Sequence, residues 1–111
     1  MARRRFRVRW AEVAVRDLEE LVSYVAADSE INATRVLKRV ETRAAALESS
    51  PARGRVVPEL AHFGMRTWRE LVVRPYRLVY RIEGDTVTVL AVVDGRRDLE
   101  DVLLERLLRT P

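Results

Sequence analysis

The stretch WRELVVRPYRLVYRIEGDTVTVLAVV, residues 68–93, decides the fold, because it alternates apolar and polar side chains and is broken twice by turn residues. Connections of two or three residues force neighbouring strands to run antiparallel. The stretch therefore predicts a three-strand meander that presents arginines. Its strands are expected near residues 66–73, 76–82 and 86–93, with turns at Arg74-Pro75 and Glu83-Gly84-Asp85.

The alternation also assigns the two faces of the middle strand. Its even-numbered residues, Tyr76 to Ile82, should cover a pair of helices, and Arg77 and Arg81 should share the open face with Val79. On the preceding strand Trp68 and Glu70 fall on one side, and a Glu beside an Arg predicts a cross-strand pair. The pair of Glu70 with Arg77 is either a structural ion pair or part of a functional site.

Two amphipathic helices precede the meander. Apolar residues recur at helical spacing from about Ala11 to Ala27, and again after Asp28 or Ser29, either of which can cap the second helix. Ser49-Ser50-Pro51 ends that helix, so the two form a tightly joined antiparallel hairpin. The remaining segments are expected to be a short strand at Arg5 to Trp10, a loop over residues 51–65, and a closing helix of about Leu99 to Arg109.

Positive charge gathers on the predicted strands. The formal net charge of +4 divides into +5 for residues 1–10 (five bases, no acids), −3 for 11–50 (five against eight), +5 for 51–81 (seven against two) and −3 for 82–111 (four against seven). All the bases except Lys38 are arginine, whose planar fork suits carboxylate or phosphate, although a biased genome would give the same skew. The acidic closing helix argues against a uniform nucleic-acid-binding surface.

Length and composition exclude several classes of protein. A chain of 111 residues builds one core, so a single domain over residues 1–111 is expected. With no cysteine and one histidine, a disulfide framework and a thiolate or histidine-rich metal site are excluded, and no cofactor is expected. No continuous apolar segment follows the basic first residues, which predicts neither export nor a membrane span, but a cytoplasmic protein.

The aromatic residues and His62 each have a plain structural interpretation. Tyr76 and Tyr80 have the parity of the covered face, and Tyr24 is expected to pack between the helices. Trp10 and Trp68 either pack on the sheet or stack on bases. His62 is either an ordinary loop histidine or a residue with a catalytic or contact role.

The order of these residues resembles the RelE/ParE superfamily of toxins from type II toxin–antitoxin systems, over nearly the full chain. The family implies a small toxin neutralised by a cognate antitoxin. RelE-type members cut messenger RNA in the ribosome, whereas ParE-type members poison DNA gyrase without nuclease chemistry. The matching segments are Ala14, Asp17-Leu18 and Tyr24, then Gly54 to Leu60, Arg69-Glu70-Leu71, Tyr76 to Tyr80, and Gly95-Arg96-Arg97-Asp98.

The resemblance to the nuclease branch is incomplete. Cleavage of RNA through its 2′-hydroxyl needs a proton acceptor, a proton donor and positive charge around the phosphorane, and arginine supplies only the last of these. RelE-type nucleases imply basic residues on the strand before the shared Tyr-Arg, where Trp68 and Glu70 stand here. They also imply a tyrosine in the closing segment, where Leu103 stands, and many relatives have a histidine where Asp94 stands.

We therefore expect an α+β fold, with a two-helix antiparallel hairpin packed on an antiparallel sheet, and a ParE-like toxin that is not an enzyme and poisons gyrase. The alternatives are a ribosome-dependent endoribonuclease, in which Arg77 and Arg97 hold phosphate and Asp94 or Glu70 is the base, and a non-toxic relative that only binds its antitoxin. Contacts to the target or antitoxin are assigned to Arg69, Arg77, Arg81, Arg96, Arg97 and Trp68, with Glu70 and Asp94 orienting the arginines.

Overall fold

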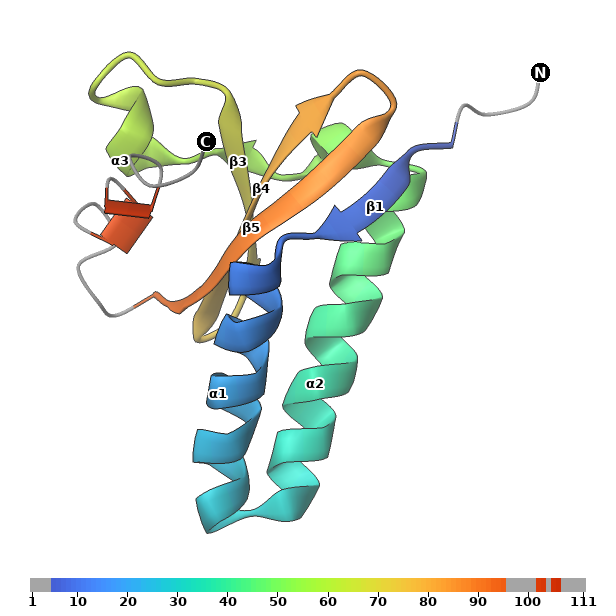
Figure 1. Cartoon of the computed structure of the whole chain (residues 1–111), viewed down its shortest axis with the longest axis vertical. Coiled ribbons are helices and arrows are strands. Elements are labelled where there is room, and N and C mark those ends of the chain that lie inside the picture. Colours follow the sequence, from blue (N-terminus) through green and yellow to red (C-terminus); the bar gives the residue numbers. More distant parts are fainter. Residues whose placement is uncertain (1–4, 96–101, 104, 107–111) are drawn as a thin grey trace.

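The computed structural model describes residues 5–95, 102–103 and 105–106, and it confirms the predicted α+β architecture (Figure 1). The hairpin of the two long helices packs on one face of a five-stranded sheet. The elements in chain order are β1 (Arg7–Trp10), α1 (Glu12–Asp28), α2 (Glu30–Ala45), the 3-10 turns Ala46–Glu48 and Pro51–Arg53, β2 (Arg55–Val56), α3 (Pro58–Ala61), β3 (Trp68–Val73), β4 (Tyr76–Glu83) and β5 (Thr86–Asp94).

The helical hairpin forms as its sequence predicts, with one exception. Ser29 is the N-cap of α2, and its Oγ accepts a hydrogen bond from the Asn32 amide at 3.2 Å. Ala14, Ala33 and other small or branched residues are buried along the seam. The prediction that Tyr24 packs between the helices is wrong, because its side chain is 83% exposed. Helical spacing gives the direction of a side chain but not whether another element reaches far enough to cover it.

The sheet has the strand order β1-β5-β4-β3-β2 and is mixed. The meander β3-β4-β5 and the short β2 pair antiparallel, whereas β1 pairs parallel to β5. The whole hairpin separates β1 from the meander in sequence, so no tight turn imposes an antiparallel direction on it. The range predicted as a loop, residues 51–65, contains β2 and α3, whose first residue Pro58 has no N–H to leave unpaired.

A β-bulge in β5 changes which side chains face the helices. Val79 pairs with Ala91 and Tyr80 with Val89, so Leu90 is an extra residue opposite β4. Val89 packs in the core under the helices, whereas Leu90 and Ala91 both pack on the other face. A strand that is apolar on both faces gives no sign of this shift in its sequence.

The sheet therefore has a core on each face. The first core lies under the helices and contains Leu78 and Tyr80, with Tyr76 and Ile82 partly buried, which confirms the predicted covered face. The second core packs β4 and β5 against α3 and Leu103, so the face predicted to be open is partly covered. Leu103 belongs to the predicted closing helix, of which Val102, Leu103, Glu105 and Arg106 are helical and the rest lies outside the described residues.

Several singled-out residues have structural surroundings. Trp68 is 6% exposed in the second core, and Trp10 is half-buried against the first, so both side chains pack on the sheet. His62 follows α3 and is exposed. Its ring lies edge-on to that of Phe63, with 5.4 Å between the ring centres. No described helix combines the length and the apolar character that a membrane span requires.

Candidate functional site

Four charged side chains converge on the second face of the sheet and form what we call the Arg77 network: Arg55, Glu59, Glu70 and Arg77. Glu70 on β3 and Arg77 on β4 point to the same face, while Arg55 comes from β2 and Glu59 from α3. The segment between the 3-10 turns and β3 thus brings two of the four residues to the sheet.

Arg77 is held by two carboxylates. Its Nη1 and Nη2 donate to the two carboxylate oxygens of Glu59 at 2.6 and 2.8 Å, and its Nε donates to Glu70 Oε1 at 2.6 Å. The second Glu70 oxygen accepts from Arg55 Nε at 2.7 Å. This confirms the predicted pairing of Glu70 with Arg77.

The network leaves little of Arg77 available to a ligand. The Arg77 side chain is 11% exposed and that of Glu70 is 0% exposed. Hydrogen bonding to Arg77 lowers the pKa of Glu59, and hydrogen bonding to Glu59 raises the pKa of Arg77. These shifts keep Glu59 and Arg77 charged near neutrality, and the network sets two carboxylates against two guanidinium groups, so it is suited to holding α3 on the sheet rather than to moving protons.

The lowered pKa of Glu59 predicts a pH-dependent stability. Because its folded-state pKa lies below the unfolded value, near 4.5, the pair stabilises the protein above that pH and loses its effect as the pH falls further. We expect Glu59→Gln to lower the free energy of unfolding on the order of 1 kcal/mol at pH 7. Urea unfolding of both proteins from pH 7 to pH 3 should show the difference shrinking below pH 4.5; a difference that is constant with pH would contradict it.

Arg69 does not join the Arg77 network. It pairs with Tyr80 across the ladder and faces the helix side, where its Nη1 donates to the Gly54 carbonyl oxygen at 2.7 Å. The Tyr80 hydroxyl donates to the Pro51 carbonyl oxygen at 2.7 Å and accepts from the Gly54 amide at 2.9 Å. Burial raises the pKa of Tyr80, so its hydroxyl stays neutral and keeps the segment before β2 in place.

Arg81 is more accessible than Arg77, and it contacts a different set of residues. Its guanidinium carbon lies 5.1 Å from the centre of the Trp68 ring, and it pairs with Glu83. Its side chain is 36% exposed, three times as much as that of Arg77 at 11%. Arg81 shares a face with Arg77, as predicted, but lies outside the Arg77 network.

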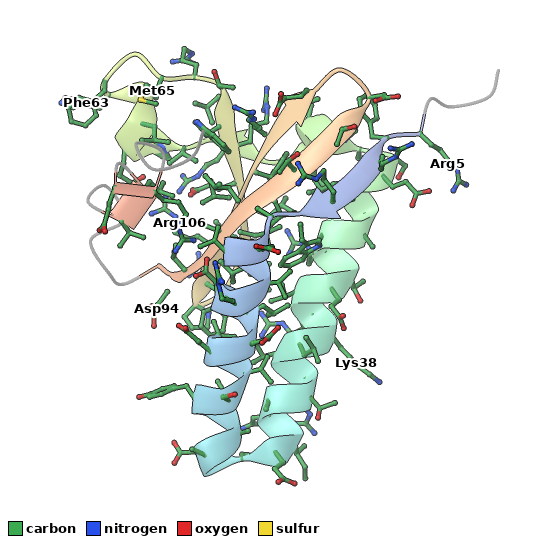
Figure 2. All side chains as sticks on the ribbon, viewed as in Figure 1. Arg5, Lys38, Phe63, Met65, Asp94 and Arg106 are labelled. Carbon is green, nitrogen blue, oxygen red and sulfur yellow. The ribbon has the colours of Figure 1, made fainter. Side chains whose placement is uncertain are left out.

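The remaining predicted site residues lie at the end of β5. Asp94 is opposite Tyr76 in the ladder, and Figure 2 labels it at the end of that strand. Arg96 and Arg97 lie outside the described residues. The structure therefore places Trp68, Glu70, Arg77 and Arg81 on one face, Arg69 on the other, and Asp94 at the strand end.

A second cluster, on Asp17, was not predicted. Val92 lies on β5 beyond the last residue that pairs with β1, and Asp17 Oδ2 of α1 accepts a hydrogen bond from its amide at 3.1 Å. The same carboxylate accepts from Arg106 Nη1 at 2.5 Å and Nη2 at 3.2 Å, so it joins α1, β5 and the C-terminal helical residues (Figure 2). The signal in the sequence was an acid within the apolar stripe of α1, between Ala14 and Leu18.

Substitutions of Asp17 separate its two roles. Asp17→Ala should lower the free energy of unfolding by about 1–3 kcal/mol, since it leaves the Val92 amide unpaired, and hydrogen exchange at that amide should accelerate. Asp17→Asn keeps an acceptor for Val92 and loses the ion pair with Arg106, so its amide exchange should stay slow. The exposed Glu19→Gln on the same helix is the control. Equal exchange rates in all three variants would contradict this role.

Comparisons with known proteins agree with this fold and site. The family model described as the ParE toxin of a type II toxin–antitoxin system, parDE, matches residues 8–99. A protein of Sinorhizobium fredii whose name, Y4kP, assigns it provisionally to the toxins is 36% identical over 101 residues, covering 89% of this chain and 98% of that protein.

Similar solved structures come from both branches of the superfamily. A chain of the chromosomal ParDE system from P. aeruginosa has a TM-score of 0.68 at 18% identity, covering 82% of this chain and 97% of that chain. A chain of the RelBE2 toxin–antitoxin complex from Mycobacterium tuberculosis has a TM-score of 0.59 at 28% identity, covering 81% of this chain and 91% of that chain. An arginine-to-alanine mutant of E. coli RelE in the free state has a TM-score of 0.63 at 19% identity, covering 96% of this chain and 99% of that chain. Because the family model matches most of its length, the chain belongs to the ParE toxins of the RelE/ParE superfamily, and it is the toxin of a type II toxin–antitoxin system.

Proposed function

We propose that this toxin arrests growth by poisoning DNA gyrase, without cutting RNA, and that a cognate antitoxin neutralises it in a hetero-oligomeric complex. Its membership of the ParE toxins supports gyrase as the target, because ParE-type toxins act on that enzyme. Two of the similar structures come from systems named for a toxin and an antitoxin, which supports the antitoxin partner. Gyrase works in the cytoplasm, and we place the toxin there with it.

The Arg77 network is the observation that carries the proposal against nuclease activity. A ribonuclease site needs free positive charge for the phosphorane and a group that exchanges protons near neutrality. Here the fork of Arg77 is filled by Glu59, and Glu70 is fully buried between two guanidinium groups. An activity that works by binding makes no such demand on these residues.

Exposure supports one of the proposed contacts. Arg81 presents its guanidinium over Trp68, and we assign target contact to it on this ground; Arg96 and Arg97 are assigned from the sequence alone. Arg69 and Arg77 act indirectly, by holding the segment from Gly54 to α3 against the sheet.

Induction of the toxin in a bacterial host tests the proposal in cells. We expect growth arrest with induction of a DNA-damage reporter, unchanged 5′ ends of translated messages, and full relief when the cognate antitoxin is co-expressed. Arg81→Ala should weaken the arrest, whereas the exposed Arg35→Ala on α2 should not. Each variant is checked for its thermal unfolding so that loss of fold is not scored as loss of contact.

Two results would contradict the proposal. Messages cut within translated codons, without DNA damage, would assign the RelE-like ribonuclease activity instead. Normal growth at high expression of the folded protein would identify a relative that only binds its antitoxin.

A further inference from the structure

The turn between α3 and β3, residues 61–67, presents a phenylalanine to solvent. Phe63 is 52% exposed, and in Figure 2 its ring lies at the outer end of this turn and points away from the sheet. The neighbouring His62 is exposed too, with its ring edge-on to that of Phe63. A single exposed apolar side chain is ordinary on a protein surface, so its surroundings decide whether it has a function.

The main chain holds Phe63 in a fixed position. The Met65 amide donates to the Leu60 carbonyl oxygen at 2.9 Å, and the Gly64 amide donates to the Ala61 carbonyl oxygen at 2.9 Å. Together with the positive φ of 78° at Gly64, these are the hydrogen bonds of a Schellman motif. Leu60 and Met65, on either side of Phe63, both pack in the second core. A partner that buries the ring therefore has only its two side-chain torsions to order, which lowers the entropic cost of binding.

The same core supports Arg81. Trp68, which follows the turn, lies in the second core with Leu60 and Met65. The partly exposed Arg81 guanidinium lies over the Trp68 ring, 5.1 Å from its centre. An exposed aromatic ring and an exposed cation are thus held by one packed unit. Aromatic residues and arginine are the side chains that most often anchor protein interfaces.

The charges of the turn favour a protein partner over a nucleic acid. Residues 61–67 contain one arginine, Arg66, and no acid. Glu59, in α3, is already bound by Arg77. A nucleic-acid surface needs a series of cations that follows the phosphate backbone, and Arg66 and Arg81 do not form a series. A weakly positive surface with a projecting apolar ring instead fits a protein pocket that has carboxylates beside it.

We propose that Phe63 is the apolar anchor by which this toxin binds its protein target. The ring enters an apolar pocket of the target, and a carboxylate beside that pocket pairs with Arg81. The inference rests on the proposed function, in which the target is gyrase, and it assigns the contact to the gyrase protein rather than to its DNA.

Binding of the labelled toxin to purified gyrase, measured by fluorescence anisotropy in the absence of DNA, tests the inference. Phe63→Ala should raise Kd at least tenfold, and Phe63→Leu should recover most of that loss, because leucine also fills an apolar pocket. The matched control Ile31→Ala removes another apolar side chain, at a residue of α2 that is 67% exposed, and should leave Kd within twofold. Thermal unfolding of each variant checks that its fold is retained.

Growth arrest in cells separates this inference from the proposed function on which it rests. If the toxin arrests growth without binding gyrase, and Phe63→Ala abolishes the arrest, gyrase is not the target but Phe63 remains the anchor. If the toxin binds gyrase and the folded Phe63→Ala variant binds it equally well, the proposed function stands and the inference is overturned.

Three further results would overturn the inference. A loss of affinity in Phe63→Ala that appears only when duplex DNA is added would assign the ring to the nucleic acid. Unchanged growth arrest by Phe63→Asp that the antitoxin no longer relieves would assign it to the antitoxin. Sedimentation of the unliganded toxin as a dimer that Phe63→Asp dissociates would assign it to a second copy of the chain.

Discussion

Replacing Arg77 with methionine is expected to lower the free energy of unfolding by about 3–5 kcal/mol. The substitution leaves Glu70, whose side chain is 0% exposed, with Arg55 as its remaining partner, and it frees Glu59 from its bidentate contact. The cost arises mainly from a buried carboxylate that loses a counter-charge, rather than from the lost attraction itself.

A second substitution distinguishes these two origins. In the double variant Arg77→Met/Glu70→Met no buried charge remains unpaired, so most of the lost stability should return. Arg66→Met, in an exposed position before β3, is the control for removing one arginine and should change stability by less than about 0.5 kcal/mol. Denaturant titration of the four proteins measures all of these values.

Unchanged stability of Arg77→Met, together with lost toxicity, would contradict the structural role and make Arg77 a direct contact. The expected result has a practical consequence for activity assays. A toxin that loses activity on substitution of Arg77 has lost part of its fold, so Arg81 is the better position at which to test contact with a target.

Gly54→Ala is expected to lower the free energy of unfolding by about 3 kcal/mol, although its backbone is unstrained. Gly54 has φ −75° and ψ 156°, which any residue can adopt. A Cβ there would lie 2.5 Å from both the Glu70 carbonyl oxygen and the Tyr80 hydroxyl oxygen. The first is main chain of β3 and the second is fixed by two hydrogen bonds, so neither can move away easily.

Gly64 provides a matched comparison for this substitution. It has φ 78° and nothing within 4 Å of a built Cβ, so Gly64→Ala has a conformational cost of about 1 kcal/mol and no steric cost. Tyr80→Phe removes one of the three atoms within 3.0 Å of a Cβ at Gly54, so it should cost less stability in Gly54→Ala than in the unsubstituted protein, where it only loses two hydrogen bonds. Thermal and denaturant unfolding of these variants measure the losses in the free energy of unfolding. Equal losses for Gly54→Ala and Gly64→Ala would contradict the steric account.

The alternation of apolar and polar residues was sufficient to predict the meander and two of the four residues of the Arg77 network, Glu70 and Arg77. The strands, the covered face of β4 and the pairing of Glu70 with Arg77 all follow from period-two patterns and short turns. The placement of Arg69 and Arg77 on opposite faces was not predicted, because both were grouped as contact residues. Local patterns of this kind are read within a few residues, and their outcome does not depend on the rest of the chain.

The other half of the site depends on contacts between distant segments. Glu59 lies on a four-residue helix in a Pro- and Gly-rich segment, where no periodicity can indicate which side chain reaches the sheet. The bulge at Leu90 and the contact of Asp17 with the Val92 amide depend on a main-chain register that an all-apolar strand does not reveal. For these reasons the sequence identified Arg77 but did not indicate that Glu59 already binds the two terminal nitrogens of its guanidinium group.

Purified gyrase, ATP and closed circular plasmid, incubated with the toxin and then treated with denaturant, test the central claim most directly. We predict linear plasmid that requires gyrase, disappears when the cognate antitoxin is added, is reduced by Arg81→Ala and is unchanged by Arg35→Ala. The absence of linear DNA at excess folded toxin would contradict the claim and direct attention to translating ribosomes.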